Sequence, residues 1–176
     1  MGWSKPHRLA VHLAGLTLSL ATVTSAAPLA SAAKPAETSV QTRARADVEA
    51  LVRQVAAAYS RNDLQAYFSY FDDDIMIWNG PNARWVKQDY VTRWTKVVGE
   101  GGGVSSLTVE DLQLRVSPKG DAVIATFAMP VIGRKNGMPA AAEPTVIYHM
   151  TEAWFKQGSR WSMAHMHWSA RTPAKP

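Results

Sequence analysis

The C-terminal part of the chain contains four long strand-like segments separated by turn sequences. The segments are 104–116, 121–132, 145–156 and 161–169. Ser-Pro-Lys-Gly at 117–120, an Asn136-Gly137 pair and Gln-Gly-Ser-Arg at 157–160 lie between them, and such residues favour turns. Long strands joined in this way pair as antiparallel neighbours. The sequence therefore predicts a four-stranded antiparallel meander that closes the domain.

Helical segments precede this sheet. Apolar residues recur at helical spacing over 48–59, which predicts an amphipathic helix of about four turns. Asn62-Asp63 ends that helix, and Asp63 can cap a second, short helix over 64–71. A buried strand over 75–78 follows, then a third helix over about 87–98. Helices first and an antiparallel sheet second define the α+β class.

The first 32 residues have the pattern of a secretory signal peptide. Lys5, His7 and Arg8 precede an apolar run over 9–23, and Ala30-Ser31-Ala32 offers the small residues that signal peptidase needs. Cleavage after Ala26, Ala32 or Ala33 fits this pattern. The run is shorter than the ~20 residues that span a bilayer. We therefore expect a periplasmic or secreted protein with no membrane attachment after cleavage.

Composition divides the rest of the chain and excludes several functions. We expect a flexible lead-in over 33–45, one domain over 46–170 and a tail over 171–176. The chain has no cysteine, which excludes disulfides, thiolate metal sites and cysteine nucleophiles. Without the signal segment, 17 basic and 14 acidic residues remain, a net charge of +3 with no basic cluster. We therefore expect no nucleic-acid partner.

Three stretches resemble one known superfamily. They are Tyr59-Ser-Arg-Asn-Asp-Leu64, Tyr70-Phe-Asp-Asp-Asp-Ile75, and the closing hairpin formed by Thr151-Glu-Ala-Trp154 and Trp161-Ser-Met-Ala-His-Met-His-Trp-Ser169. They resemble the SnoaL-like branch of the nuclear transport factor 2-like superfamily. The hairpin also resembles the association domain of calcium/calmodulin-dependent kinase II. The resemblance implies a cone-shaped fold, with a pocket between helices and a curved sheet whose outer face often dimerises.

The closing strand is expected to carry the main site residues. Strict alternation places Trp161, Met163, His165 and His167 on one face, and Ser162, Ala164, Met166 and Trp168 on the other. In the related families the first of these faces lines the cone. We therefore predict that His165 and His167 face the pocket, where a histidine can act as acid or base. Met166 and Trp168 are then expected at a homodimer interface, since a monomer would expose them.

Glu152, on the adjacent strand, is the third candidate catalytic residue. A carboxylate there would orient a histidine, or its own pKa would be raised by burial. The alternatives are an ion pair with Arg84, Arg93 or Arg115, and simple exposure. A single bulge in this strand would exchange its face with that of His149 and Thr151.

The many aromatic residues predict a pocket for a small aromatic or hydrophobic molecule. The expected substrate-binding residues are Trp78, Asn79, Tyr59, Trp94, Tyr148 and Met163. A metal held by the two neighbouring histidines, with His149 or Glu152 as third ligand, is the alternative. Because the related families mostly work without metal, we expect no metal and no cofactor.

The resemblance does not extend to the catalytic residues of ketosteroid isomerase. By that resemblance, the tyrosine donor of the isomerase falls on Val55 and its general-base aspartate on Asn79. Neither side chain can perform the corresponding proton transfer. We predict a cofactor-free lyase or isomerase of another design, in which His165 or His167 is the base and Glu152 orients it. The alternative is a non-catalytic ligand-binding or oligomerisation module.

Overall fold

The computed structural model describes residues 36–79 and 84–173, and it confirms the α+β class. In chain order the elements are α1 (Ser39–Ser60), α2 (Leu64–Ser69), β1 (Phe71–Asn79), α3 (Lys87–Gly99), β2 (Gly103–Leu107), β3 (Glu110–Val116), β4 (Ala122–Arg134), β5 (Val146–Gln157) and β6 (Arg160–Arg171). The predicted signal peptide lies outside the described residues. None of the described helices is both long and apolar enough to cross a membrane.

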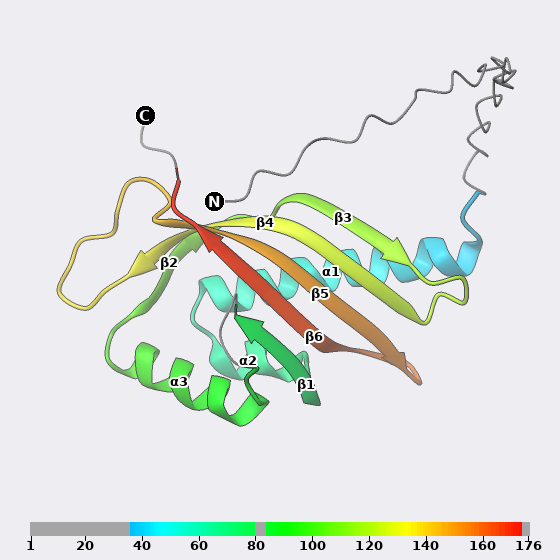
Figure 1. Ribbon diagram of the computed structural model, residues 1–176, viewed down its shortest axis with the longest axis horizontal. Coiled ribbons are helices and arrows are strands. Elements are labelled where there is room, and N and C mark those ends of the chain that lie inside the picture. Colours follow the sequence, from blue (N-terminus) through cyan, green and yellow to red (C-terminus); the bar gives the residue numbers. More distant parts are fainter. Residues whose placement is uncertain (1–35, 80–83, 174–176) are drawn as a thin grey trace, which may run out of the picture. The chain divides into compact units, whose positions relative to one another are not determined.

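The strands form one curved sheet, and the helices lie together on one side of it (Figure 1). The order is β1-β6-β5-β4, and β4 pairs along different parts of its length with β2 and with β3. β1 runs parallel to β6, whereas all other pairs are antiparallel. The predicted single strand over 104–116 is therefore two strands. The ladder to β4 is irregular where β3 begins, and Asp111 has a positive φ of 52° there.

Helix α1 begins earlier than predicted, inside the segment expected to be a flexible lead-in. Thr38 and Gln41 form a capping box, in which the Thr38 side chain accepts from the Gln41 backbone N–H and the Gln41 side chain accepts from that of Thr38. Arg45 forms an ion pair with Glu37 and donates to the Leu114 carbonyl oxygen at 2.8 Å. These contacts fix the first turns of α1 against β3.

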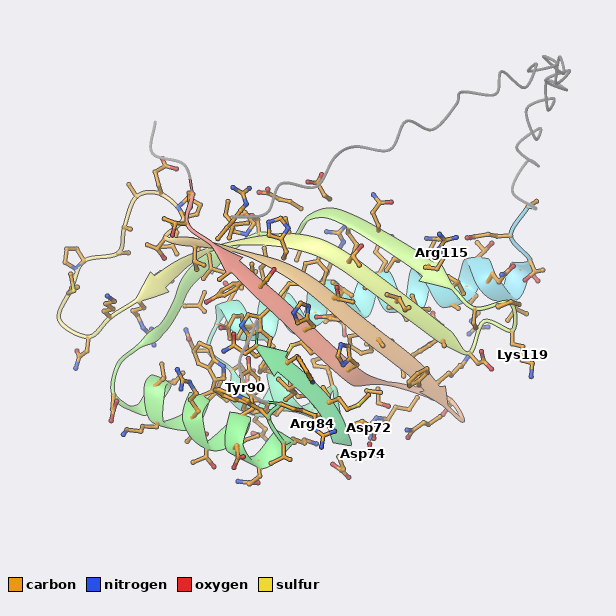
Figure 2. The ribbon with its side chains drawn as sticks, viewed as in Figure 1. Asp72, Asp74, Arg84, Tyr90, Arg115 and Lys119 are labelled. Carbon is orange, nitrogen blue, oxygen red and sulfur yellow. The ribbon has the colours of Figure 1, made fainter. Side chains whose placement is uncertain are left out.

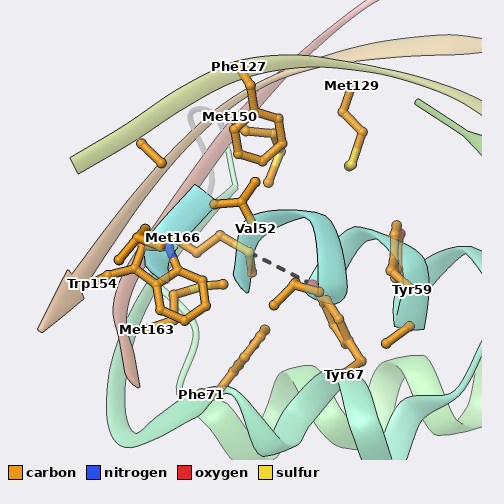
Figure 3. Packing of buried hydrophobic residues seen from close by; sticks show 14 of the residues in the cluster. Val52, Tyr59, Tyr67, Phe71, Phe127, Met129, Met150, Trp154, Met163 and Met166 are labelled. Atoms are coloured by element: carbon orange, nitrogen blue, oxygen red, sulfur yellow. Dashed lines mark hydrogen bonds between the residues drawn. The ribbon is translucent and has the colours of Figure 1, made fainter. Parts of the chain in front are cut away.

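The hydrophobic core lies between α1 and the inner face of the sheet. Val48 and Val52 of α1, Ala125 of β4, and Trp154 of β5 are fully buried. Figure 3 shows side chains from the strands facing Tyr59 and other side chains from the helices across this layer. The periodic apolar residues of α1 therefore cover the sheet, as their helical spacing predicts.

Asn62 connects the end of α1 to the sheet. It adopts a left-handed conformation with φ of 57°. Its Nδ2 donates to the Val104 carbonyl oxygen at 2.9 Å, and its Oδ1 accepts from the Val104 N–H at 2.8 Å. A side chain on Gly103 would collide with Asn62 Oδ1, because an added Cβ would lie 2.1 Å from that oxygen. This junction sets the distance between the helices and β2.

Replacement of Asn62 separates its two roles. Asn62→Gly keeps the left-handed backbone but removes both hydrogen bonds, and we expect a loss of about 2 kcal/mol in the free energy of unfolding. Asn62→Ala also strains the backbone, so we expect a loss of about 3 kcal/mol. Urea unfolding of the wild type and both variants measures these differences. Two variants each within 0.5 kcal/mol of wild type, as is usual for plain surface changes, would contradict this role.

Candidate functional site

Two adjoining cavities lie between the inner face of the sheet and the helices. The mouth cavity, of about 40 Å³, is lined by Tyr59, Tyr67, Tyr90, Met129, Tyr148, Met150, Met166 and Trp168. The deep cavity, of about 20 Å³, is lined by Val52, Val55, Ala56, Tyr59, Tyr67, Phe127, Met129, Met150, Glu152 and Met166. Tyr148 and Trp168 are only partly buried, so the mouth cavity reaches the surface beside them.

The size of the cavities limits what they hold without rearrangement. A water molecule needs roughly 10–15 Å³ of such space, so the two cavities hold a few waters. A ring-sized ligand requires side chains to move. Met129, Met150 and Met166 line both cavities, and methionine changes rotamer readily. Figure 3 shows these three thioethers opposite Tyr59 and Tyr67. The site is therefore narrow but adaptable.

Glu152 lies in the wall of the deep cavity with almost no solvent exposure. Its Oε2 accepts a hydrogen bond from Trp154 Nε1 at 2.9 Å, and this is its only side-chain hydrogen bond within the described residues. None of the Lys, Arg and His side chains that the structure describes lines either cavity, so the expected alternative of an ion pair with Arg84, Arg93 or Arg115 is wrong. Burial raises the pKa of Glu152 to about 7, although the Trp154 hydrogen bond opposes the rise. Both protonation states of Glu152 are therefore available near neutral pH.

Two tyrosine hydroxyl groups form the other polar feature of this site. The Tyr67 hydroxyl lies 3.3 Å from that of Tyr90 and contacts Met166 Sδ at 3.8 Å. Burial raises the pKa of Tyr90 to about 12 and that of Tyr67 well above its ordinary value. Both groups therefore keep their protons at neutral pH and act as hydrogen-bond donors.

A one-residue bulge in β6 reverses the predicted faces of the closing strand. Trp154 pairs with Met163 and Ala153 pairs with His165, so Ala164 is the extra residue. Beyond the bulge, Met166 and Trp168 point toward the helices and line the cavities.

The histidines consequently lie on the opposite side of the sheet. His165 pairs with Met76 of β1 and His167 with Trp78, and His167 lines a groove on that side. The prediction that His165 and His167 face the pocket is therefore wrong. The prediction that Met166 and Trp168 form an outer interface is also wrong, because both face inward.

The other predicted site residues have different positions. Tyr59 and Tyr148 line the mouth cavity, and Tyr59 also lines the deep one. Trp94 lies behind them, with its ring 5.1 Å from that of Tyr59 in an edge contact. Trp94 lines neither cavity, and the same is true of the other three predicted residues: Met163 is fully buried in the core, Trp78 is 46% exposed on the far side of the sheet, and Asn79 is half-buried at the end of β1.

Sequence reasoning missed several lining residues, and one signal could have found some of them. In the second half of β6, Met166 and Trp168 are more apolar than His165 and His167, and the apolar face of a strand belongs in the core. Tyr67, Tyr90, Met129 and Met150 carry no such local signal, because apolar residues of this kind are common in any core. Val55, where the isomerase donor was expected to fall, lines the deep cavity without a polar group.

The metal alternative does not fit the observed positions. Glu152 lies on the inner side of the sheet, whereas His165 and His167 lie on the other side. His149 Nε2 accepts a hydrogen bond from Arg171 Nε at 3.1 Å. Within 36–79 and 84–173, no group of three or more His, Asp or Glu side chains is placed to hold a metal ion.

Comparison with known proteins identifies the family of this chain. The SnoaL-like domain family matches residues 48–173, and the chain belongs to this family. No curated protein gives a significant match.

Solved structures confirm the nuclear transport factor 2-like fold. An NTF2-like protein of unknown function in nutrient uptake from Rhodospirillum rubrum is 20% identical, with a TM-score of 0.59 over 71% of this chain and 98% of that one. A ketosteroid isomerase-like protein from Erwinia carotovora atroseptica is 18% identical, with a TM-score of 0.58 over 73% and 96%. A proposed Ca/calmodulin-dependent kinase II association domain from Exiguobacterium sibiricum is 9% identical, with a TM-score of 0.59 over 74% and 95%.

The raised pKa of Glu152 predicts how stability changes with pH. The folded state holds the Glu152 proton more tightly than the unfolded state, so this contribution is present at low pH and is lost as pH rises to about 7. We expect the free energy of unfolding of wild type, relative to Glu152→Gln, to fall by about 2 kcal/mol between pH 5 and pH 8. Urea unfolding of both proteins at each pH measures this difference.

The paired design removes other titrations from the result. The pKa of His165 is lowered by burial and by His167, which gives an opposite trend as pH rises toward the ordinary histidine range. That trend is common to both proteins and cancels. A difference that stays constant with pH would show that Glu152 titrates in the folded state as it does in the unfolded chain.

Proposed function

We propose that this protein is a cofactor-free acid–base enzyme, an isomerase or lyase, that acts on a small aromatic or hydrophobic molecule. The proposal depends on Glu152, a buried carboxyl group with a pKa near 7 that lines a cavity walled by tyrosine, tryptophan and methionine. The ketosteroid isomerase-like neighbour has the same fold and supports this class of chemistry without specifying a substrate. Glu152 takes over the role that the sequence had suggested for His165 or His167.

The arrangement is suited to moving a proton at carbon. Ionised Glu152 removes a proton from a carbon next to a carbonyl group, and the electron pair moves to the carbonyl oxygen. The Tyr67 and Tyr90 hydroxyls are the available donors for that oxygen. An isomerase returns the proton to another carbon, whereas a lyase expels a leaving group from the neighbouring carbon. Because no cationic side chain of the described residues lines the cavities, an anionic substrate is not expected.

The rival is a binding protein that uses the same cavity without catalysis. The small volume supports it, since a ligand must displace the methionine side chains before it reaches Glu152. The two functions differ in one measurement. If the protein only binds its ligand, a neutral aromatic such as 2-naphthol raises its thermal unfolding temperature. The rate of proton transfer then stays equal to the rate in buffer without protein.

Base catalysis by Glu152 is testable with 5-nitrobenzisoxazole, a neutral aromatic probe. Loss of its C–H proton to the base breaks the ring N–O bond and gives a coloured cyanophenolate. We expect Glu152→Gln to lower the catalysed rate at least 100-fold, within the range for a general base. We expect the wild-type rate to rise with pH and level off above about 7, because Glu152 must be ionised.

Two further variants make the assay specific. Thr151→Ala is the matched control, since Thr151 is adjacent in sequence but lies on the opposite face of the sheet. We expect this control to react at the wild-type rate. A loss with His167→Ala as large as that with Glu152→Gln would contradict the proposed site and return it to the histidines.

The expected location is likewise a proposal. The signal-like residues 1–32 support export to the periplasm or the medium. N-terminal sequencing of the exported protein should find a start at residue 27, 33 or 34.

A further inference from the structure

Glu152 and Trp154 stand two residues apart on β5, and their side chains contact each other in the core. Both side chains are buried, and that of Trp154 is completely enclosed. The indole Nε1 of Trp154 donates to Glu152 Oε2 at 2.9 Å, whereas Glu152 Oε1 has no hydrogen-bond partner among the described residues. The two oxygens of the carboxyl group are therefore not equivalent. One is bound to the core, and the other remains available at the wall of the deep cavity.

The strands beside β5 place apolar side chains opposite Glu152. Ala125 of β4 and Met166 of β6 are its partners in the two ladders, and neither side chain can donate a conventional hydrogen bond. The bulge in β6 produces this arrangement, since pairing without the extra residue would place His165 opposite Glu152. An imidazole would compete for the proton of the carboxyl group. The indole of Trp154 donates a hydrogen bond but takes up no proton at neutral pH, so it can orient Glu152 without this competition.

Two tyrosines are the titratable groups that face Glu152 across the deep cavity. Tyr59 comes from α1 and Tyr67 from α2, and the other described residues that line this cavity on α1, β4, β5 and β6 are apolar. Tyr90 of α3 lines the mouth cavity instead. Burial raises the pKa of Tyr59 and of Tyr67 well above the ordinary value, so both hydroxyls stay neutral. Ionisation of these groups therefore does not disturb Glu152 near neutral pH.

The basic side chains of the neighbouring strands lie away from Glu152. The histidines of β5 and β6 lie on the other side of the sheet, and they are His149, His165 and His167. Arg115 and Lys119 are exposed, and Figure 2 shows both near the end of β3. The Trp154 hydrogen bond is therefore the polar contact that distinguishes the ionised from the protonated form of Glu152.

We infer that Trp154 is the positioning residue of the general base: its N–H holds Oε2, which leaves Oε1 as the oxygen that removes and returns the substrate proton. The inference rests on the proposed function, in which ionised Glu152 is the base. A donor to a carboxylate also favours the ionised form, so the same hydrogen bond keeps more of Glu152 ionised near neutral pH. Loss of the donor should therefore change two quantities, the pH at which Glu152 ionises and the rate that ionised Glu152 supports.

Trp154→Phe removes the donor and keeps an aromatic ring. The midpoint of Glu152 ionisation is measured from the carbon-13 signal of its carboxyl carbon between pH 5 and pH 10, and Glu152→Gln assigns the signal by removing it. The wild-type midpoint is expected at about 7. We expect Trp154→Phe to raise it by about one pH unit, because a hydrogen bond to the charged form is lost. A midpoint within about 0.3 of wild type would overturn the inference.

The conversion of 5-nitrobenzisoxazole separates positioning from basicity. A stronger base reacts faster once it is ionised, so a change in basicity alone would raise the rate measured well above the midpoint. We expect Trp154→Phe to lower that rate at least threefold, because the carboxylate is no longer held in one orientation. At pH 6 the loss should reach at least tenfold, since less of the variant is ionised there. A rate above the midpoint that equals or exceeds that of wild type would overturn the positioning role.

Trp161→Phe is the matched control. Trp161 is also buried, but its Nε1 has no hydrogen-bond partner within 36–79 and 84–173, so the same change removes no hydrogen bond. We expect it to leave the midpoint and the rate unchanged, and a midpoint that rises as in Trp154→Phe would overturn the inference. Because Trp154→Phe leaves space in the core, a second variant carries 3-benzothienylalanine in place of Trp154. This side chain keeps the size of the indole without its N–H, and we expect the same two effects.

The two measurements also separate this inference from the proposed function. A wild-type protein that does not convert the probe would contradict the proposed function, and with it the role of Oε1 as the base. An active wild type whose midpoint and rate are retained in Trp154→Phe would overturn this inference alone and leave Glu152 as the base.

Discussion

The bulge at Ala164 determines what the sheet presents to each side. Without it, strict alternation from Met163 would turn His165 and His167 into the core and expose Met166 and Trp168. An unpartnered polar group in a core costs about 1–3 kcal/mol, whereas a buried methionine contributes about 2 kcal/mol. One unpaired residue in the ladder is a smaller loss than two misplaced imidazoles. The cavities on one side and the outer face on the other both depend on this exchange.

The sequence predicted the parts of the fold that follow a fixed period. Helical spacing in α1 and α3, and turn residues between the long strands, identified those elements because each signal lies within a few neighbouring residues. The early start of α1 was not predicted, but the sequence carries a signal for it, since Thr38 and Gln41 form a recognised capping pair. The bulge leaves no mark on Ala164 itself, but the apolar face of β6 changes there from the side of Trp161 and Met163 to the side of Met166 and Trp168.

The sequence likewise predicted only part of the candidate site. Glu152 was identified from its place on the strand, and the structure places it inside a cavity. Its partner could not be identified from spacing, since the expected histidines lie beyond the bulge. Tyr67 and Tyr90 come from α2 and α3, and only the packing of these helices brings their hydroxyls together. Convergence of residues from separate elements is a tertiary property that one sequence does not display.

Glu152 lowers the stability of the folded state, so packing alone does not explain its presence. A carboxyl group with no cationic partner in its cavity destabilises the folded state above neutral pH, and an apolar residue would fill the same space without this loss. Such local conflicts are expected where function requires them. Because side chains alternate along β5, Thr151 and Ala153, the sequence neighbours of Glu152, lie on the side of the sheet that faces away from the helices. Opening of the cavities depends on the methionine side chains that line them and on the mouth beside Tyr148 and Trp168.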